Sequence, residues 1–334
     1  MSLVVSSTPG SPKAKLDAAI RQVKPSVRHD SPVDEFQVDL QTGMFILRQT
    51  DIFVPDSMPL ALTRTYRVWD AGTRAFGVGT NHPYDICPTG KRSSYTYMDL
   101  NLEDGRRFHF PRVSSGTGYA DVVYRHDETS SEFYGAQIAW DGNGWTLDFA
   151  DHRKFIFPES SHIKNFAQAA AIEMRDEKGN RILLKRDKVR NLAELVSPAG
   201  HSISFKYDSA DRIVEARDDA GNIRKYYYGA NEHLETVSDG AHVLYRFGYE
   251  RLPQFSRWNP YFMTSVSTGN GKELVRNWYG DRSHVTKQRL ADGRIYEYDY
   301  LFDRSHDVVE TTVTLPNGTK KKFFFNQGKL VQQK

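Results

Sequence analysis

The 334-residue sequence has a single cysteine, Cys87, which excludes an internal disulfide bond and a zinc site made of cysteines. No stretch of about 18 apolar residues is present, so no membrane-spanning helix is expected. Residues 1–25 contain no apolar core of signal-peptide length. We therefore expect a soluble chain whose localisation is open. If its parent protein is exported, the route would be a specialised secretion system.

The sequence also lacks an excess of charge and the common catalytic motifs. Its 45 basic and 42 acidic residues leave a net charge of +3, which gives no electrostatic footprint for nucleic acid. It has no HExxH, Walker, GxSxG or dinucleotide-binding pattern. The eleven histidines show no metal-ligand spacing. We therefore expect a protein that is not an enzyme and that uses no cofactor and no metal.

Two pairs of acidic residues raise the alternative of a glycoside-processing enzyme. Glu103-Asp104 and Asp218-Asp219 each precede a glycine, and aspartate is favoured at turns because it bonds the local backbone. A glycosidase needs two carboxylates that face each other across a cleft, about 5–10 Å apart. The sequence shows no such pair, so this alternative ranks third among the functions considered below.

What the sequence does have is aromatic residues, 18 Tyr and 19 Phe, arranged in a repeat. Seven glycines each open a copy of one short pattern, and aromatic side chains occupy both its fifth and its seventh position in five of the seven copies. The glycines are Gly179, Gly200, Gly221, Gly240, Gly271, Gly293 and Gly318. The residues at the fifth and seventh positions are Leu184/Arg186, Phe205/Tyr207, Tyr226/Tyr228, Tyr245/Phe247, Arg276/Trp278, Tyr298/Tyr300 and Phe323/Phe325.

This pattern predicts a β-hairpin repeat. Side chains two positions apart point to the same face of a strand, and a turn glycine reaches positive φ without strain. The thirteenth residue after the glycine is Leu192, Ile213 or Leu234 in the first three copies, which we place on the returning strand. The predicted fold is all-β, with consecutive antiparallel hairpins that form a long, curved sheet.

The repeat resembles the YD repeat of the RHS and teneurin family. The resemblance is carried by Phe205-Lys206-Tyr207-Asp208, by Arg212-Ile213 and by Asp219-Ala220-Gly221-Asn222. The next copy, with Tyr226 to Tyr228, Leu234 and Asp239-Gly240, is similar.

The upstream region resembles the domain that opens many bacterial RHS proteins. The matching residues are Ser31-Pro32-Val33-Asp34, Gly43, Thr50-Asp51, Val54-Pro55, Pro59-Leu60, Arg64-Thr65-Tyr66, Phe76-Gly77-Val78-Gly79 and His82-Pro83-Tyr84-Asp85. Thr80-Asn81 stands where the family usually has tryptophan. We therefore expect a flexible leader at 1–30, an RHS-type N-terminal β domain at 31–160 and a YD-repeat hairpin array at 161–334.

The resemblance implies a structural module: part of an RHS-type shell that encloses or presents a cargo or toxin partner. Family members that release a toxin carry a self-cleaving core rich in proline and aspartate, followed by the toxic domain, and neither is found after the last repeat. We therefore expect a shell segment without cargo. Its final strands, Phe323 to Val331, would leave an open edge. A partner strand, another RHS segment or self-association would cover that edge.

One irregularity supports a second function, a carbohydrate- or cell-surface-binding module. The spacing from Gly240 to Gly271 is longer than in the other copies, and the additional residues at 251–263 include Phe255, Trp258, Tyr261 and Phe262. Insertions in repeat arrays tend to form loops on a contact face, and aromatic rings there anchor proteins or sugars. In the alternative interpretation, the same rings fold back and cover the sheet.

Overall fold

The computed structural model describes residues 37–67, 72–90, 94–128, 131–159, 169–252, 261–280, 282–326 and 329–334. The leader predicted at 1–30 lies outside these residues. Within them the chain is all-β, as predicted. No helix among them is long and apolar enough to cross a membrane.

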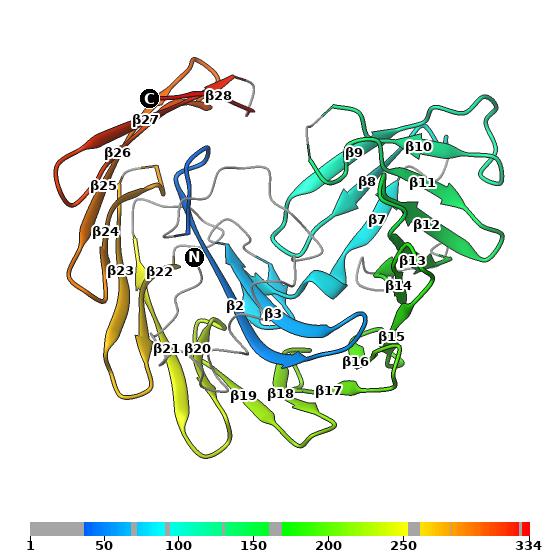
Figure 1. Cartoon of the computed structure of the whole chain (residues 1–334), viewed down its shortest axis with the longest axis horizontal. Helices are drawn as coiled ribbons and strands as arrows, with labels where there is room; N and C mark the ends of the chain where they lie inside the picture. The colour runs from blue at the N-terminus through cyan, green and yellow to red at the C-terminus, as the bar shows by residue number, and fades with distance from the viewer. Residues whose placement is uncertain are drawn as a thin grey trace.

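One antiparallel sheet of nineteen strands dominates the molecule and follows the chain order from β10 to β28 without a crossover. Figure 1 shows that this sheet curves through an open arc, from β10 at one end to β28 at the other. Its strands are β10 (Val123–Arg125), β11 (Gln137–Trp140), β12 (Gly144–Asp148), β13 (Lys154–Pro158), β14 (Glu173–Arg175), β15 (Arg181–Arg186), β16 (Leu192–Val196), β17 (Ser202–Tyr207), β18 (Ile213–Asp218), β19 (Ile223–Tyr228), β20 (Leu234–Ser238), β21 (Val243–Arg251), β22 (Tyr261–Thr268), β23 (Glu273–Tyr279), β24 (Val285–Leu290), β25 (Ile295–Phe302), β26 (Val308–Thr314), β27 (Lys320–Asn326) and β28 (Lys329–Gln333).

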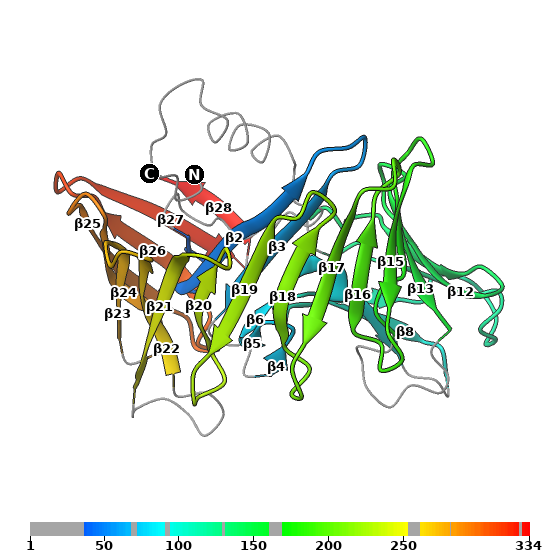
Figure 2. The same cartoon turned by 90° about the horizontal axis from the view of Figure 1, so that it is seen from below.

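The residues before this sheet form smaller sheets and one short 3₁₀ helix. Figures 1 and 2 show that β2 and β3 form a hairpin inside the arc. The elements are β1 (Val38–Asp39), β2 (Met44–Val54), β3 (Leu60–Arg67), β4 (Thr73–Arg74), β5 (Gly77–Val78), β6 (Thr80–Asn81), η1 (Pro83–Asp85), β7 (Cys87–Gly90), β8 (Tyr97–Asn101) and β9 (Arg107–Pro111). We call the described residues from 37 to 111 the inner segment.

Two kinds of turn build the five repeats in which both turns are described. All seven predicted turn glycines have positive φ, between 80° and 95°, in open space where the turn itself requires glycine. The opposite turn places a non-glycine residue at positive φ, for example Asp211 at 58°. There the carboxylate of Asp208 accepts the backbone N–H groups of Ala210 and Arg212, which holds the turn closed.

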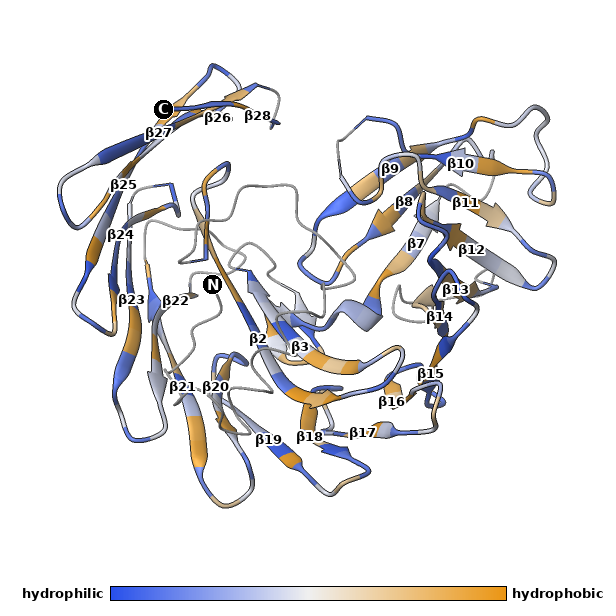
Figure 3. Cartoon of the chain, in the orientation of Figure 1, coloured by the Kyte–Doolittle hydropathy of each residue, from blue (hydrophilic) through white to orange (hydrophobic). Residues whose placement is uncertain are grey.

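The predicted faces of the strands are confirmed in most repeats. Tyr207, Tyr228, Phe247 and Tyr300 lie on strands and pack on the core. Leu192, Ile213 and Leu234 begin the returning strands and are fully buried. In Figure 3, polar and apolar residues alternate along many strands of the sheet, as expected when one face packs and the other meets solvent.

The fifth copy differs from the predicted register. Trp278 is 39% exposed and packs beside Lys287 and Arg289. Asn277 is buried instead, and Tyr279 packs on the core. The inward-facing positions of β23 therefore lie one residue later than the count from Gly271 indicates. A single extra residue turns all the following side chains of a strand to the opposite face.

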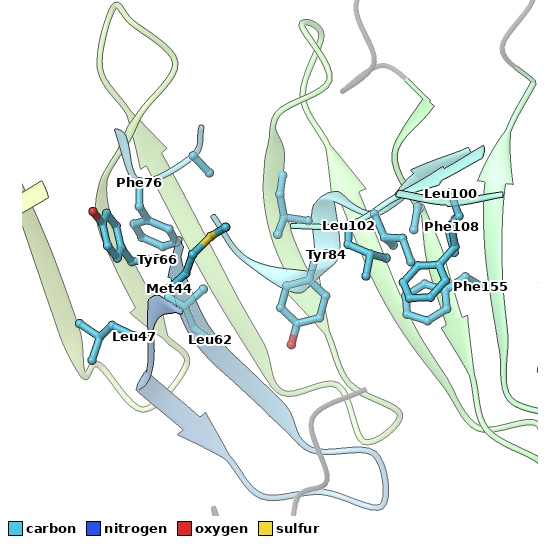
Figure 4. Close-up of a cluster of buried hydrophobic side chains, with 14 of the residues drawn as sticks. Met44, Leu47, Leu62, Tyr66, Phe76, Tyr84, Leu100, Leu102, Phe108 and Phe155 are labelled. Atoms are coloured by element: carbon cyan, nitrogen blue, oxygen red, sulfur yellow. The ribbon is translucent and has the colours of Figure 1, made fainter. Parts of the chain in front are cut away.

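The core lies between the inner segment and the sheet. One continuous cluster of buried apolar residues includes side chains from both. Figure 4 shows Tyr66, Phe76 and Phe108 of the inner segment in this cluster, together with Phe155 of β13. Strands β13 and β14, which lie on either side of the predicted domain boundary between residues 160 and 161, pair in the same sheet. The boundary itself stays a prediction.

Candidate functional site: the concave face

The inner segment runs along the concave face of the sheet in the direction opposite to the repeat order. Its early residues contact late repeats and its late residues contact early ones, with two exceptions. The β2–β3 hairpin extends to Tyr226 and Ala199 through Asp51 and Asp56, and the order is inverted within the β4–β5 hairpin. The hydrogen bonds are Thr311 Oγ1 to Leu40 O (2.5 Å), Val285 N to Gly43 O (2.7 Å), Met263 N to Tyr66 Oη (3.0 Å), Val78 N to Glu232 O (3.1 Å), Ile213 N to Ala75 O (2.7 Å), Arg186 Nη2 to Tyr84 O (2.6 Å) and Ala171 N to Ile86 O (3.1 Å).

A second series of hydrogen bonds joins each repeat to the previous one. In six successive repeats, a side chain that we call the clasp residue donates to the backbone carbonyl of a residue 15 or 16 positions upstream, which we call the joint residue. The pairs are Arg186 Nε with Ala171 (2.9 Å), and the Oη atoms of Tyr207 with Leu192 (2.9 Å), Tyr228 with Ile213 (2.5 Å), Tyr249 with Leu234 (3.0 Å), Tyr279 with Met263 (2.7 Å) and Tyr300 with Val285 (2.8 Å).

The two series meet at the joint residues. Ile213, Met263 and Val285 each donate their N–H to the inner segment and accept a tyrosine hydroxyl at their carbonyl. Each lies opposite a tyrosine of its own hairpin at a β-bulge, where the regular ladder is interrupted. The bulge therefore frees a backbone amide of the sheet, and the inner segment accepts this amide at each of the three residues.

Only part of this arrangement was visible in the sequence. The tyrosines at the seventh position, Tyr207, Tyr228 and Tyr300, were found, but their bonds to the joint residues were not. Tyr249 and Tyr279 were missed because they lie nine and eight residues after their glycines. In the first copy, Arg186 acts as the clasp and also pairs with Asp85 of the inner segment at 3.1 Å.

A buried ion pair lies at the centre of the concave face. Arg64 binds Asp51 through Nε at 2.5 Å and through Nη2 at 3.0 Å. The hydroxyl of Tyr226, from the sheet, donates to the same carboxylate at 2.9 Å. Burial, and then the Asp51 charge, raise the pKa of Tyr226 well above its usual value. The guanidinium also lies beside the rings of Phe76, Tyr226 and Phe247, at 5.3–6.0 Å from their centres.

A second buried polar cluster lies within the inner segment. Arg67 pairs with Asp39 at 3.2 Å and with Asp104 at 3.1 Å. Asp104 also accepts the backbone N–H of Arg106 at 3.1 Å, which is the turn role expected of it. Burial, and then the neighbouring Asp104 charge, raise the pKa of Glu103 to about 7.

Asp218 serves a turn as well. Its carboxylate accepts the backbone N–H of Asn222 at 2.8 Å and its side-chain amide at 2.7 Å. Asp219, next to it, is exposed and bonds His201 at 2.7 Å. In both acid pairs, aspartates are therefore engaged in turns or ion pairs. Among the described residues, no group of three or more His, Cys, Asp or Glu side chains gathers to hold a metal ion.

Two glycines of the inner segment allow its close approach to the sheet. Gly43, at φ +67°, faces the ring of His284, and Gly77, at φ +81°, faces the carbonyl oxygen of Glu232. A β-carbon at either position would overlap these atoms. The resemblance to the family had included both glycines, and the structure supplies the physical reason for them.

The predicted contact loop is described only at its end. Phe255 and Trp258 lie outside the described residues. Tyr261 is half-buried on β22, and Phe262 is 2% exposed, with its ring 5.1 Å from that of Tyr279. Phe262 therefore covers the sheet. A contact role for the loop stays a prediction.

All five residues of the last strand, β28, are exposed, and the strand pairs only with β27 among the described strands. Leu330 and Val331 on this strand are 42% and 61% exposed. The Nζ atom of Lys329 donates to the carbonyl oxygen of Glu128, which follows β10, at 3.0 Å. Residues from opposite ends of the sheet thus come into contact.

The fold and the concave face define a β-hairpin repeat protein whose own N-terminal region lines its sheet. A family model described as a domain of unknown function (DUF6531) matches residues 36–110, which is nearly the whole inner segment. No curated protein matches the chain.

Several solved structures are similar to the chain, although the superpositions are loose. The crystal structure of TcdB2-TccC3-Cdc42 is 12% identical with a TM-score of 0.35, over 86% of this chain and 18% of that one. The Photorhabdus luminescens Tc holotoxin pore is 12% identical with a TM-score of 0.33, over 83% and 18%. A porin-like protein from Bacteroides uniformis is 10% identical with a TM-score of 0.24, over 93% and 96%. The chain thus spans less than a fifth of the two toxin chains.

Proposed function

We propose that this chain is a non-enzymatic scaffold of the RHS type, a segment of a shell wall that encloses or presents a polypeptide cargo. The observation that carries the proposal is the double series of hydrogen bonds on the concave face. The wall holds a long polypeptide, its own inner segment, partly through backbone N–H groups of several repeats. Backbone recognition of this kind requires little particular sequence, which suits a surface that encloses protein chains.

Further support comes from the sequence. The repeats resemble YD repeats, and the family model matches the region that resembles the RHS opening domain. Three of the four acids that raised the glycosidase alternative, Asp104, Asp218 and Asp219, are used in turns and ion pairs, which favours a structural role over catalysis.

The test of enclosure is protease protection. A short flexible peptide with one protease site is fused after Lys334, and its cleavage rate is compared in two chains. One carries the natural sequence, and the other carries Gly43→Arg and Gly77→Arg, which displace the inner segment. Enclosure predicts cleavage about tenfold slower in the natural chain, because cleavage tracks the accessible population. Equal rates would contradict it.

The same protein distinguishes the alternative functions. A carbohydrate-binding module would bind a glycan array, and this binding would disappear in a Trp258→Ala variant. A glycoside-processing enzyme would hydrolyse a glycan panel and would lose the activity when a single carboxylate, Glu103 or Asp218, becomes its amide. The scaffold predicts neither binding nor hydrolysis.

A further inference from the structure

Three histidines lie at the contacts between the inner segment and the sheet. His82 is next to η1, whose Tyr84 carbonyl accepts the Arg186 clasp. His233 directly follows Glu232, which accepts Val78 N–H, and His284 directly precedes Val285, which donates to Gly43. His82 and His233 are buried, and His284 is half-buried.

His82 is enclosed by aromatic rings, with Phe76 at 6.0 Å, Tyr84 at 5.8 Å and Phe205 at 6.4 Å between ring centres. Neither of its ring nitrogens makes a hydrogen bond within the described residues. Two charged groups face it. Asp85 Oδ2 is 3.8 Å from Nε2, which is beyond hydrogen-bond distance. Oδ1 of the same carboxylate pairs with Arg186 at 3.1 Å, and the positive charge of Arg186 opposes a second cation.

His233 packs on Tyr249 and Tyr261, at 4.5 and 5.9 Å between ring centres. Its Nδ1 bonds the carbonyl oxygen of Asn231 at 2.9 Å, and its Nε2 makes no hydrogen bond within the described residues. The charged group that acts on it is Glu232, whose carboxylate accepts the Thr73 hydroxyl of the inner segment at 3.1 Å.

His284 fills the space beside Gly43 and packs on Tyr300 and Phe302, at 5.2 and 5.0 Å. The charged group on its own turn is Arg282, a like charge for an imidazolium. On the opposite side, the charged residue of the Gly43 turn is Asp39. Its carboxylate is used by the N–H groups of Gln41 and Thr42 and by Arg67.

We propose that mild acid, between pH 7 and pH 5, releases the inner segment from the concave face. The three imidazoles pack on aromatic rings, no acceptor among the described residues lies within hydrogen-bond distance of the unbonded ring nitrogens of His82 and His233, and His284 lies beside the like charge of Arg282. The proposal requires the docked inner segment, and it holds whether or not the wall encloses a cargo. It is therefore tested separately from the proposed function.

The electrostatics agree in direction. Burial lowers the pKa of His82 and of His233, and it lowers the pKa of His284 to about 4. A histidine with a lowered pKa stabilises the docked state above its free pKa of about 6.5, and this stability is lost as the pH falls. Glu103 acts in the opposite direction, because its raised pKa favours the protonated folded state in this range. Release in mild acid therefore requires that the destabilisation from the three histidines exceed the stabilisation from Glu103.

The chain carries a probe for release. Cys87, the only cysteine, lies on β7 of the inner segment and packs on Ala169 and Ala170, which precede β14 in the same chain. Burial raises the pKa of its thiol to about 12. Its reaction with 4,4′-dithiodipyridine, a disulfide that reacts across this pH range, reports when the inner segment leaves the sheet.

The experiment measures the labelling rate of Cys87 in the full chain from pH 7.5 to pH 5.0, divided by the rate in the urea-unfolded chain at the same pH. We expect the protection of Cys87 to fall at least about tenfold. Each histidine held neutral in the docked state lowers the equilibrium constant for docking by up to tenfold for each pH unit below the free pKa. Far-UV circular dichroism at each pH monitors the sheet. Protection that stays constant with pH overturns the proposal, as does loss of the whole sheet with the same midpoint.

The variant His82→Phe/His284→Phe keeps a ring at both positions and removes two titrating groups. We expect it to lose most of the pH dependence of protection. If the double variant fails to fold, His284→Phe alone provides the measurement, with a smaller loss of slope. His242→Gln and His306→Gln, which change exposed histidines, serve as matched controls that keep the full slope. A full slope in the ring variants would overturn the proposal.

Discussion

The hydroxyl oxygen of Tyr66 accepts the backbone N–H of Met263 at 3.0 Å, across 197 residues of sequence. At Ile213 and Val285, backbone carbonyls of the inner segment accept the equivalent N–H groups. Ala171 donates in the same way to the carbonyl of Ile86, so a tyrosine side chain replaces a backbone group at one of four such contacts. Its ring also packs on Tyr249, at 6.0 Å between ring centres, so it joins the inner segment to the sheet in two ways.

Tyr66→Phe tests the value of this contact. The change keeps the ring and leaves the buried N–H of Met263 without its acceptor, which costs about 1–3 kcal/mol. We expect the free energy of unfolding to fall by that amount in urea denaturation. Tyr134→Phe, at an exposed tyrosine, is the control and should leave the stability unchanged. Equal stability of all three proteins would show that Tyr66 does not hold Met263.

The clasp tyrosines give a second prediction. Tyr228→Phe and Tyr300→Phe each remove one hydrogen bond to a joint carbonyl and should cost about 1 kcal/mol. Tyr227, the neighbour of Tyr228, points to solvent, so Tyr227→Phe is a control one residue away. If Tyr227→Phe destabilises the chain as much as Tyr228→Phe, the assignment of the two faces is wrong.

Glycine substitutions separate backbone strain from close approach. Gly200→Ala places a side chain at positive φ in open space, and it should cost about 1–2 kcal/mol. Gly77→Ala adds a collision with the Glu232 backbone to the same strain, so it should cost clearly more and expose Cys87 to thiol labelling. Equal losses measured by urea denaturation would mean that the inner segment is not in contact with the sheet at this point.

The raised pKa of Glu103 leads us to predict that the free energy of unfolding depends on pH. Its pKa is raised to about 7 from a usual value near 4.5, so the folded chain binds this proton more tightly than the unfolded chain. The stabilisation is complete below pH 4.5 and is lost as the pH rises to about 7, with a slope of up to about 1.4 kcal/mol per pH unit. Glu103→Gln should remove this contribution. Parallel stability curves for the two proteins between pH 5 and pH 8 would contradict the assignment.

The sequence allowed prediction of the repeats because each copy carries its own local signals. The turn glycines and the returning-strand residues such as Ile213 were placed correctly, since strand periodicity and positive φ act within one hairpin. The fifth copy was misread because an extra residue, Leu274, lies at a bulge of β23 against β22 and shifts Tyr279 by one position, which a count from Gly271 does not detect.

The location of the inner segment could not be predicted. Its contacts with the sheet join backbone groups, such as Ile213 N–H and Ala75 C=O, and these leave no pattern of side-chain types. The buried Arg64–Asp51–Tyr226 contact involves residues up to 175 positions apart. Asp51 and Arg64 are among the residues that resemble the RHS opening domain. Their partner Tyr226 cannot be distinguished by sequence from the other tyrosines of the repeats.

The central claim is that the inner segment lies along the sheet in a fixed register, and disulfide cross-linking tests it most directly. The Asp56 carboxylate accepts the backbone N–H of Ala199 at 2.9 Å, which places the tip of the β2–β3 hairpin at the turn of the second repeat. Oxidation of a Ser57→Cys/Ala199→Cys chain should form the cross-link in high yield, while Cys87 stays buried. Asn317 occupies the equivalent position before the last turn glycine, so Ser57→Cys/Asn317→Cys is the matched control. Cross-linking of the first pair alone is the predicted result, and equal yields for both pairs would contradict the fixed register.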